Sequence, residues 1–291
     1  MFILALILAV TFGTPTKLAN IKNRSIDESS GLVASRSNAG VYWTHNDSGG
    51  GPFIYAFDAT GESRGVFRVN GAQARDWEDI SIGPGPSRGR WYLYIGDIGD
   101  NEGKRTEVVV YRVPEPALTA ADNTTTKKAP RTIAAAEAIR LRYPDGPHDA
   151  ESLLVHPVSG NLYIVSKNMM RPAVVYEAVA PLVAGAVITM KKVGEMKVPS
   201  LLGGALTGGS ISPDGRHVAF CDYFQGFELE LPAGSKNFND VWKQKMVSFP
   251  LGQREQGESI AYRADGNALL ATSEGKSPPL FQVERRRSNN Q

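Results

Sequence analysis

Three glutamates in this chain, Glu78, Glu151 and Glu258, each stand directly before a run of residues predicted to form a buried β-strand. A carboxylate at the edge of a core is costly unless a cation or hydrogen-bond donors compensate its charge. Ser30 and Gly209 occupy the same place in two further segments of similar pattern. These five positions are separated by 48, 73, 58 and 49 residues, so their chemistry depends on the repeated element that carries them.

The repeated segments each contain three strand-like runs joined by a turn and a polar loop, and they begin near Ser29, Trp77, Ala150, Gly208 and Gly257. Further strand-like runs lie between them, and their spacing is close to the roughly 40–50 residues of a propeller blade. We therefore predict an all-β fold, a β-propeller of four-stranded antiparallel blades. Five blades are expected, or six if the longest interval hides a degenerate one. Residues 17–23 could supply the outer strand that closes the ring. A β-sandwich is the competing fold, but its strands would not repeat one pattern at blade length.

In a propeller the innermost strands line a central channel, so residues at the start of those strands face its axis. The loops after the second strands lie at the same end of the channel. Polar residues in those loops are His45, Asn46, Asp47, Ser48, Asp97, Asp100, Asn101, Lys167, Asn168, Asp222 and Glu274. The pairs Arg75 and Asp76, and His148 and Asp149, stand just before two of the glutamates. Every blade is thus expected to contribute a polar residue to one end of the channel.

Several carboxylates near one axis repel each other unless a cation or basic groups compensate them. Hard oxygen ligands in irregular number suit Ca²⁺ better than Zn²⁺. The predicted metal ligands are Glu78, Glu151, Glu258, Asp47, Asp97 and Asp222, and the predicted ligand-binding residues are Asn46, Arg75, Lys167, Asn168 and Glu274. In the alternative interpretation no metal is bound. The glutamates then cap the inner strands, accept backbone amides and pair with Arg75, Lys167 or Arg254.

Residues 208–231, GGSISPDGRHVAFCDYFQGFELEL, resemble the corresponding stretch of six-bladed calcium-dependent lactonase and esterase propellers, the gluconolactonase and paraoxonase group. They also resemble related bacterial propellers of the NHL and esterase-like phytase type. The resemblance implies a metal-ligand role for Asp222 and for one of the axial glutamates. Where the lactonase pattern has an Asn before the strand, this chain has Gly208 and Gly209.

Two functions are consistent with these residues. The first is a binding propeller whose acidic axial site holds Ca²⁺ or a small-molecule, glycan or protein ligand. The second is a Ca²⁺-dependent hydrolase of lactones or esters, with His45 or His148 as general base and Glu151 as a metal ligand. The segment GGSIS, residues 208–212, does not match the G-x-S-x-G nucleophile motif. The single cysteine, Cys221, excludes an intramolecular disulfide.

Composition sets the remaining expectations. A net charge of +2 and a pI near 8.5 are too mild to predict a nucleic-acid partner. The apolar run from Phe2 to Val10 is too short to span a bilayer but fits the core of a signal peptide, with Gly13 or Ala19 as cleavage sites. An N-terminal β-strand is the alternative. We predict a secreted or periplasmic monomer, with residues 1–20 as signal peptide or extension, 21–284 as the propeller and 285–291 as a basic polar tail.

Overall fold

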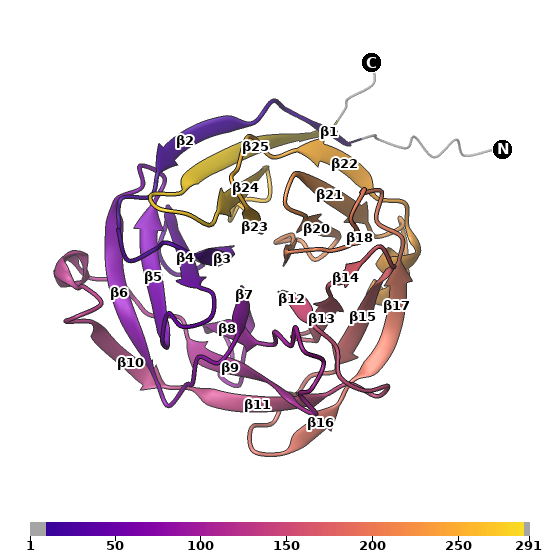
Figure 1. The fold of residues 1–291 in the computed structure, drawn as a ribbon, viewed down its shortest axis with the longest axis horizontal. Helices are drawn as coiled ribbons and strands as arrows, with labels where there is room; N and C mark the ends of the chain where they lie inside the picture. The colour runs from indigo at the N-terminus through magenta and orange to yellow at the C-terminus, as the bar shows by residue number, and fades with distance from the viewer. Residues whose placement is uncertain (1–9, 288–291) are drawn as a thin grey trace.

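The computed structural model describes residues 10–287, which form a ring of five antiparallel sheets around a central axis (Figure 1). The apolar run predicted as a signal peptide lies outside the described residues, except for Val10. The strands of each blade are given from the innermost to the outermost. Blade 1 is β3 (Ser29–Ala34), β4 (Val41–Asn46), β5 (Phe53–Asp58) and β6 (Ser63–Asn70), and blade 2 is β7 (Trp77–Pro84), β8 (Trp91–Asp97), β9 (Val108–Pro114) and β11 (Glu137–Arg142). Blade 3 is β12 (Ala150–Val155), β13 (Leu162–Ser166), β15 (Ala173–Ala178) and β17 (Lys191–Met196). Blade 4 is β19 (Gly208–Ile211), β20 (His217–Cys221), β21 (Gln225–Glu230) and β22 (Val247–Pro250), and blade 5 is β23 (Gly257–Tyr262), β24 (Ala268–Ser273), β25 (Pro279–Arg287) and β2 (Thr16–Asn20). The five-bladed propeller predicted from the repeats is confirmed.

The turn between the first two strands of every blade ends in a glycine, and these are Gly40, Gly89, Gly160, Gly215 and Gly266. Their φ angles lie between 70° and 76°, in the left-handed region that side chains with a Cβ disfavour. The repeated glycine is therefore required by the geometry of the hairpin, and it explains why the turn pattern is visible in the sequence. All five turns lie at the end of the channel opposite to the glutamates.

The ring is closed by strands from both ends of the chain. β2 pairs antiparallel with β25, from Thr16 opposite Gln282 to Asn20 opposite Pro279, which agrees with the outer strand expected from residues 17–23. A short strand, β1 (Val10–Phe12), pairs with the last residues of β25. Closing a propeller with strands from both termini ties the first and last residues of the ring together.

The strands extend beyond both expected boundaries of the propeller, 21 and 284. Arg285 was expected in a solvated tail, but it belongs to β25 and its Nε donates to Glu228 Oε1 at 2.7 Å. Both side chains are buried. The correction has a physical reason, because the partner of Arg285 comes from the neighbouring blade and leaves no local signal in the sequence. Residues 288–291 lie outside the described part of the chain.

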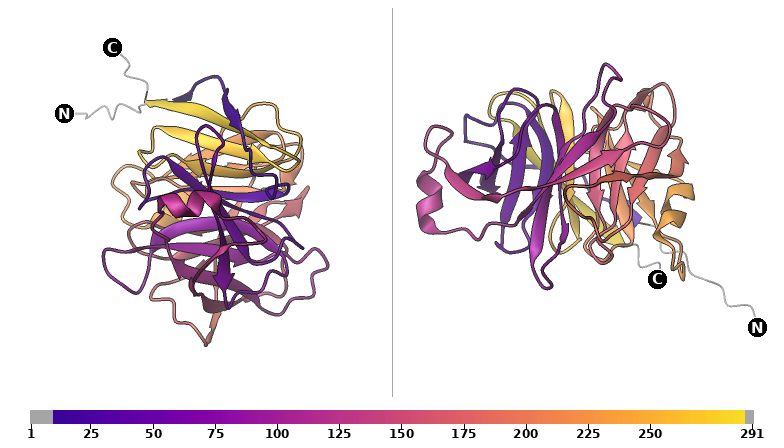
Figure 2. Two further views of the ribbon diagram at one scale, coloured as in Figure 1. Left: turned by 90° about the vertical axis from the view of Figure 1, so that its left-hand side faces the viewer. Right: turned by 90° about the horizontal axis from the view of Figure 1, so that it is seen from below.

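A sixth blade is not present among residues 10–287. The longest interval between repeats instead carries a 3-10 helix, η1 (Ala120–Thr124), and β10 (Arg131–Ala135), which pairs parallel with β6 of blade 1. Figure 2 shows η1 projecting from the rim of the disc. The remaining elements are β16 (Val187–Thr189), parallel to β11, the ladder of β14 (Asn168–Met169) with β18 (Gly203–Gly204), and η2 (Phe238–Lys243).

The apolar core is divided among the five interfaces between neighbouring blades rather than gathered at the centre. Trp43 of blade 1 and Trp77 of blade 2, for example, are fully buried in one cluster together with Phe67. The inner strands contact each other in the closed order β3, β7, β12, β19, β23. Because packing is completed between blades, the axis is left to polar side chains. Among the described residues, no helix is long and apolar enough to cross a membrane.

Candidate functional site

The predicted axial glutamates each lie at a β-bulge. Trp77 pairs with Asp97 and Asp79 with Gly96, so Glu78 is an extra residue without a partner in the ladder. The same register shift isolates Ser30, Glu151 and Glu258. In blade 4, by contrast, Gly208 and Gly209 pair in regular register. A bulge re-aims the side chain at the extra position. Here it turns polar groups toward the loops at one end of the channel, which we call the channel mouth.

Three carboxylates meet at the mouth, those of Asp47, Asp76 and Glu78, and we call them the acidic triad. One oxygen of each lies within 4.8 Å of the others. Asp47 follows β4 and Asp76 precedes β7, so blades 1 and 2 both contribute. A Cβ added at Gly99, in the loop after β8, would collide with the carboxylate oxygens of Glu78 and Asp76. The backbone of this loop therefore closes against the triad.

Glu78 is the most deeply buried member of the triad. It is only 3% exposed, yet its carboxylate makes no hydrogen bond or ion pair with any described residue. Burial raises its pKa well above the ordinary value, and the charges of Glu151 and Asp47 raise it further. Burial likewise raises the pKa of Asp76, with Asp47 adding to the effect. Among the described residues, no cation forms an ion pair with the triad, although the charge of Arg105 partly opposes the rise in the pKa of Asp76.

Glu151 has a partner. Its Oε1 forms an ion pair with Nζ of Lys167, whereas Oε2 is buried without a hydrogen bond. Nζ of Lys167 also lies 5.4 Å from the centre of the Tyr223 ring. Burial raises the pKa of Glu151 to about 7, against the lowering effect of Lys167. The pairing that we considered as the alternative to a metal is thus present at this glutamate.

Glu258 accepts a hydrogen bond from Nε2 of Gln256 at 2.8 Å and has no ion pair with a described residue. Burial raises its pKa to about 8, and the charge of Glu151 contributes next. Burial also raises the pKa of Glu274, followed by the charge of Asp47. Glu78, Glu151 and Glu258 therefore lie within electrostatic reach of one another, although they come from three blades.

Two predicted metal ligands are engaged elsewhere. Asp97 forms an ion pair with Arg105 at 2.8 Å and accepts the backbone N–H of Arg75 at 3.1 Å. Asp222 accepts from the backbone N–H groups of Phe224 and Gln225, both at 2.8 Å, and from Ser200 Oγ at 2.6 Å. Neither aspartate belongs to the acidic triad. Protein donors bind both oxygens of Asp222, and Asp97 is paired with Arg105, although its Oδ1 makes no hydrogen bond.

The predicted ligand-binding amides also make local contacts. Asn46 donates to Asp27 Oδ1 at 2.8 Å, and Asn168 donates to Ser166 Oγ at 2.9 Å. Arg254, the third basic group considered as a partner, donates to backbone carbonyls of residues 222 and 272 rather than to a glutamate. These three side chains stabilise the loops around the mouth.

The two predicted general bases lie in different surroundings. His45 is fully buried, packs edge-on against Trp77 with ring centres 5.6 Å apart, and leaves Nε2 without a partner. Burial lowers its pKa, so the ring is neutral. Nε2 of His148 lies 3.0 Å from Asp145 Oδ1 and 2.7 Å from the hydroxyl of Tyr176. Among the described residues, no hydrogen bond or ion pair joins either ring to a carboxylate of the triad.

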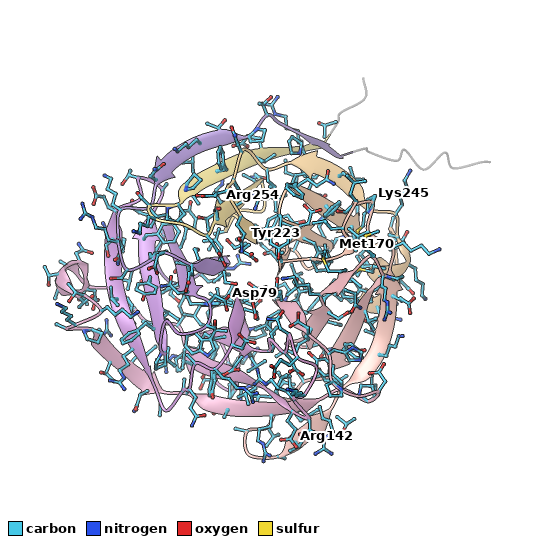
Figure 3. The ribbon with its side chains drawn as sticks, viewed as in Figure 1. Asp79, Arg142, Met170, Tyr223, Lys245 and Arg254 are labelled. Carbon is cyan, nitrogen blue, oxygen red and sulfur yellow. The ribbon has the colours of Figure 1, made fainter. Side chains whose placement is uncertain are left out.

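Asp79 was missed in the sequence, although it follows Glu78 directly. It is fully buried near the axis (Figure 3), and its Oδ2 accepts from the backbone N–H of Leu153 at 2.9 Å and of Gly209 at 3.3 Å. Its Oδ1 accepts from the N–H of Ile80 at 2.8 Å. One carboxylate therefore joins the inner strands β7, β12 and β19. The sequence did contain a signal for this residue, because a charged side chain inside a segment predicted to be a buried strand must have hydrogen-bond partners.

Comparison with known proteins gives no family for this chain, because no family model and no curated protein matches it. Among solved structures it is similar to a chain of a nidogen/laminin complex, with a TM-score of 0.45 and 12% identity. The match covers 85% of this chain and 72% of that one. At this identity the likeness bears on no residue of the site. The resemblance of residues 208–231 to calcium-dependent lactonases stays a prediction.

Proposed function

We propose that the protein binds a divalent cation, Ca²⁺, at the channel mouth through Asp47, Asp76 and Glu78. The observation that carries the proposal is the buried carboxylate of Glu78, which faces two other carboxylates and has no donor among the described residues. Like charges brought together in a buried setting repel strongly, and a bound cation removes that cost.

The donor set suits Ca²⁺. All three ligands are carboxylates, and Ca²⁺ takes about 6–8 oxygen ligands in flexible geometry. Zn²⁺ prefers the nitrogen and sulfur donors of His and Cys, which the triad does not contain. Three side chains leave coordination positions for water or for an oxygen atom of a ligand. The site would therefore act as a binding site for a small molecule that carries oxygen donors. We do not propose hydrolysis, because no hydrogen bond or ion pair joins His45 or His148 to a carboxylate of the triad among the described residues.

We further propose that the protein is exported, in keeping with the apolar run from Phe2 to Val10. Extracellular calcium modules bind with dissociation constants of about 10⁻⁴–10⁻³ M. Cleavage after Gly13 would leave β2 whole, whereas cleavage after Ala19 would remove most of the strand that closes the ring. Fractionation of the producing cell, with mass spectrometry of the mature N-terminus, tests this. A cytoplasmic chain that keeps Met1 would contradict it.

Thermal unfolding of chelator-treated protein, with and without millimolar Ca²⁺, tests the metal proposal. A cation that binds only the folded state, at about 1 to 10 times the dissociation constant expected above, adds roughly 0.4–1.4 kcal/mol to the stability. We expect a clear rise in Tm, lost in Glu78→Gln. The matched control is Glu62→Gln. The Glu62 side chain is 57% exposed and lies between β5 and β6, at the end of blade 1 opposite to the mouth. It should keep the full response. Absence of a shift in the wild type, with no heat of binding in calorimetry, would overturn the proposal.

A further inference from the structure

An apolar groove opens beside the channel mouth on blade 4. Leu201 is 93% exposed, the highest value among the large apolar side chains of the described residues, and Phe224 is 69% exposed. Both line an open groove of about 570 Å³ that continues to Phe249 and Pro250 of β22. Exposed apolar surface of this kind, bordered by polar groups, marks sites of interaction.

The two walls of the groove are held in place by one carboxylate. Oδ2 of Asp222 accepts from Ser200 Oγ, next to Leu201, at 2.6 Å. Its Oδ1 accepts from the backbone N–H of Phe224 at 2.8 Å. The groove is therefore preformed, and a ligand would lose less conformational entropy in ordering it. Asp222, which we predicted from the sequence as a metal ligand, therefore holds the two walls of the groove together.

The groove is continuous with the acidic mouth through Tyr223. The ring centres of Tyr223 and Phe224 lie 6.4 Å apart. The ammonium group of Lys167, at the mouth, contacts the Tyr223 ring. Figure 3 shows Tyr223 close to the channel and Met170 farther out. The backbone N–H of Met170 donates to the carbonyl of Leu202 at 3.0 Å, which places this exposed and flexible side chain beside the groove.

Carboxyl groups lie near Tyr223, at the end of the groove that faces the mouth. Glu258 and Glu274 form no ion pair with a described residue, and both lie within the field of the mouth. Lys167 shows what these groups can hold, because its ammonium group sits between the Tyr223 ring and the Glu151 carboxylate. A second cationic side chain, supplied from outside, would find an aromatic ring and two carboxyl groups without an ion pair to a described residue, and its charge would favour their ionised form.

We propose that the groove and the mouth together dock an extended segment of another polypeptide. One or two large apolar side chains of the segment lie between Leu201 and Phe224, and an adjacent Lys or Arg side chain reaches Glu258 and Glu274. The proposal rests on the acidic character of the mouth but does not require the metal. A membrane fits less well, because the groove is hollow rather than protruding and the neighbouring carboxylates repel anionic headgroups.

Selection from a library of random displayed peptides on the folded protein tests this. We expect the enriched peptides to combine large apolar residues with Lys or Arg. One enriched peptide, labelled for fluorescence anisotropy, should bind about tenfold more weakly to Phe224→Ser, since aromatic anchors dominate such contacts. Glu274→Gln should weaken binding and reduce its dependence on salt. The matched control is Val183→Ser, a 59% exposed side chain that lines a separate groove between blades 2 and 3. It should bind as the wild type does.

Several outcomes would overturn the inference. They are a library without enrichment, enriched peptides without basic residues, and equal affinity of Phe224→Ser and wild type. Flotation with phosphatidylcholine vesicles that depends on Phe224 would assign the groove to a membrane, and a dimer that depends on Phe224 in light scattering would assign it to a second copy. Phe224→Ser should keep the full rise in Tm with Ca²⁺. The docking surface and the metal site therefore fail or succeed separately.

Discussion

Neutralising Glu258 should stabilise the metal-free protein, and it should do so only where the carboxylate is ionised. Glu258 is 5% exposed, lies at the bulge that begins β23, and has a single neutral hydrogen-bond partner, Gln256. Burial raises its pKa from 4.5 to about 8, with the charge of Glu151 adding to the effect. A glutamine has nearly the same shape and removes the charge.

The sign of the effect follows from proton linkage. Between about pH 4.5 and pH 8 the folded protein retains a proton on Glu258 that the unfolded chain has released, so stability falls as the pH rises through this window. At about 1.4 kcal/mol for each unit of pKa, the full cost approaches 5 kcal/mol above pH 8 and is about 1 kcal/mol near pH 5.5. Glu258→Gln should therefore increase the free energy of unfolding by about 3 kcal/mol more at the higher pH.

Urea unfolding in the presence of a chelator, at about pH 5.5 and pH 8.5, measures both values. Glu255→Gln is the control, because this carboxylate lies three residues earlier and is exposed. It should leave both values unchanged. An equal effect of Glu258→Gln at the two pH values, or a loss of stability at pH 8.5, would refute the reasoning. The charge of Glu258 would then be compensated in the folded protein.

Three further changes test other parts of the mouth. Gly99→Ala places a methyl group against the carboxylate of Glu78 and should weaken Ca²⁺ binding in calorimetry at least tenfold; unchanged affinity would remove Gly99 from the site. Lys167→Met leaves the buried carboxylate of Glu151 unpaired and should cost about 3 kcal/mol at pH 8 in urea unfolding. The loss should shrink toward pH 5, where Glu151 is protonated, and a loss independent of pH would point to packing instead. Asp79→Ala leaves backbone amides of β12 and β19 without an acceptor and should cost about 3 kcal/mol, whereas an unchanged urea midpoint would contradict its role as a link between blades.

The fold was predictable because its signals are local. Each hairpin turn needs a glycine in the left-handed region, as at Gly215, and each blade repeats the same apolar runs around it. The strand at residues 17–23 was found for the same reason. Pairing between distant segments left no such trace. The parallel addition of β10 to β6 and the burial of Arg285 against Glu228 depend on neighbours that only the folded chain supplies.

The sequence indicated which polar residues lie at the mouth, but not which of them have hydrogen-bond or ion-pair partners. Sequence position correctly placed Asp47 and Glu78 at the mouth, yet it treated Asp76 only as a flanking residue. It could not distinguish a carboxylate without donors, such as Glu78, from one that is fully hydrogen-bonded, such as Asp222. That difference depends on which backbone N–H groups the loops present, and loop conformation is not readable from residue types alone.

The bulges explain why the mouth has two different sides. In a regular strand a residue at the position of Glu78 would alternate toward the apolar interface between blades, where a charge is costly. The extra residue at each bulge turns the side chain toward the channel instead, in blades 1, 2, 3 and 5. Blade 4 has glycines in regular register and supplies no axial carboxylate. It is also the blade that carries the groove beside Phe224. The glycines at this position leave blade 4 without an axial carboxylate on the side where apolar surface begins, and a ligand that combines a cation with an apolar group matches that asymmetry.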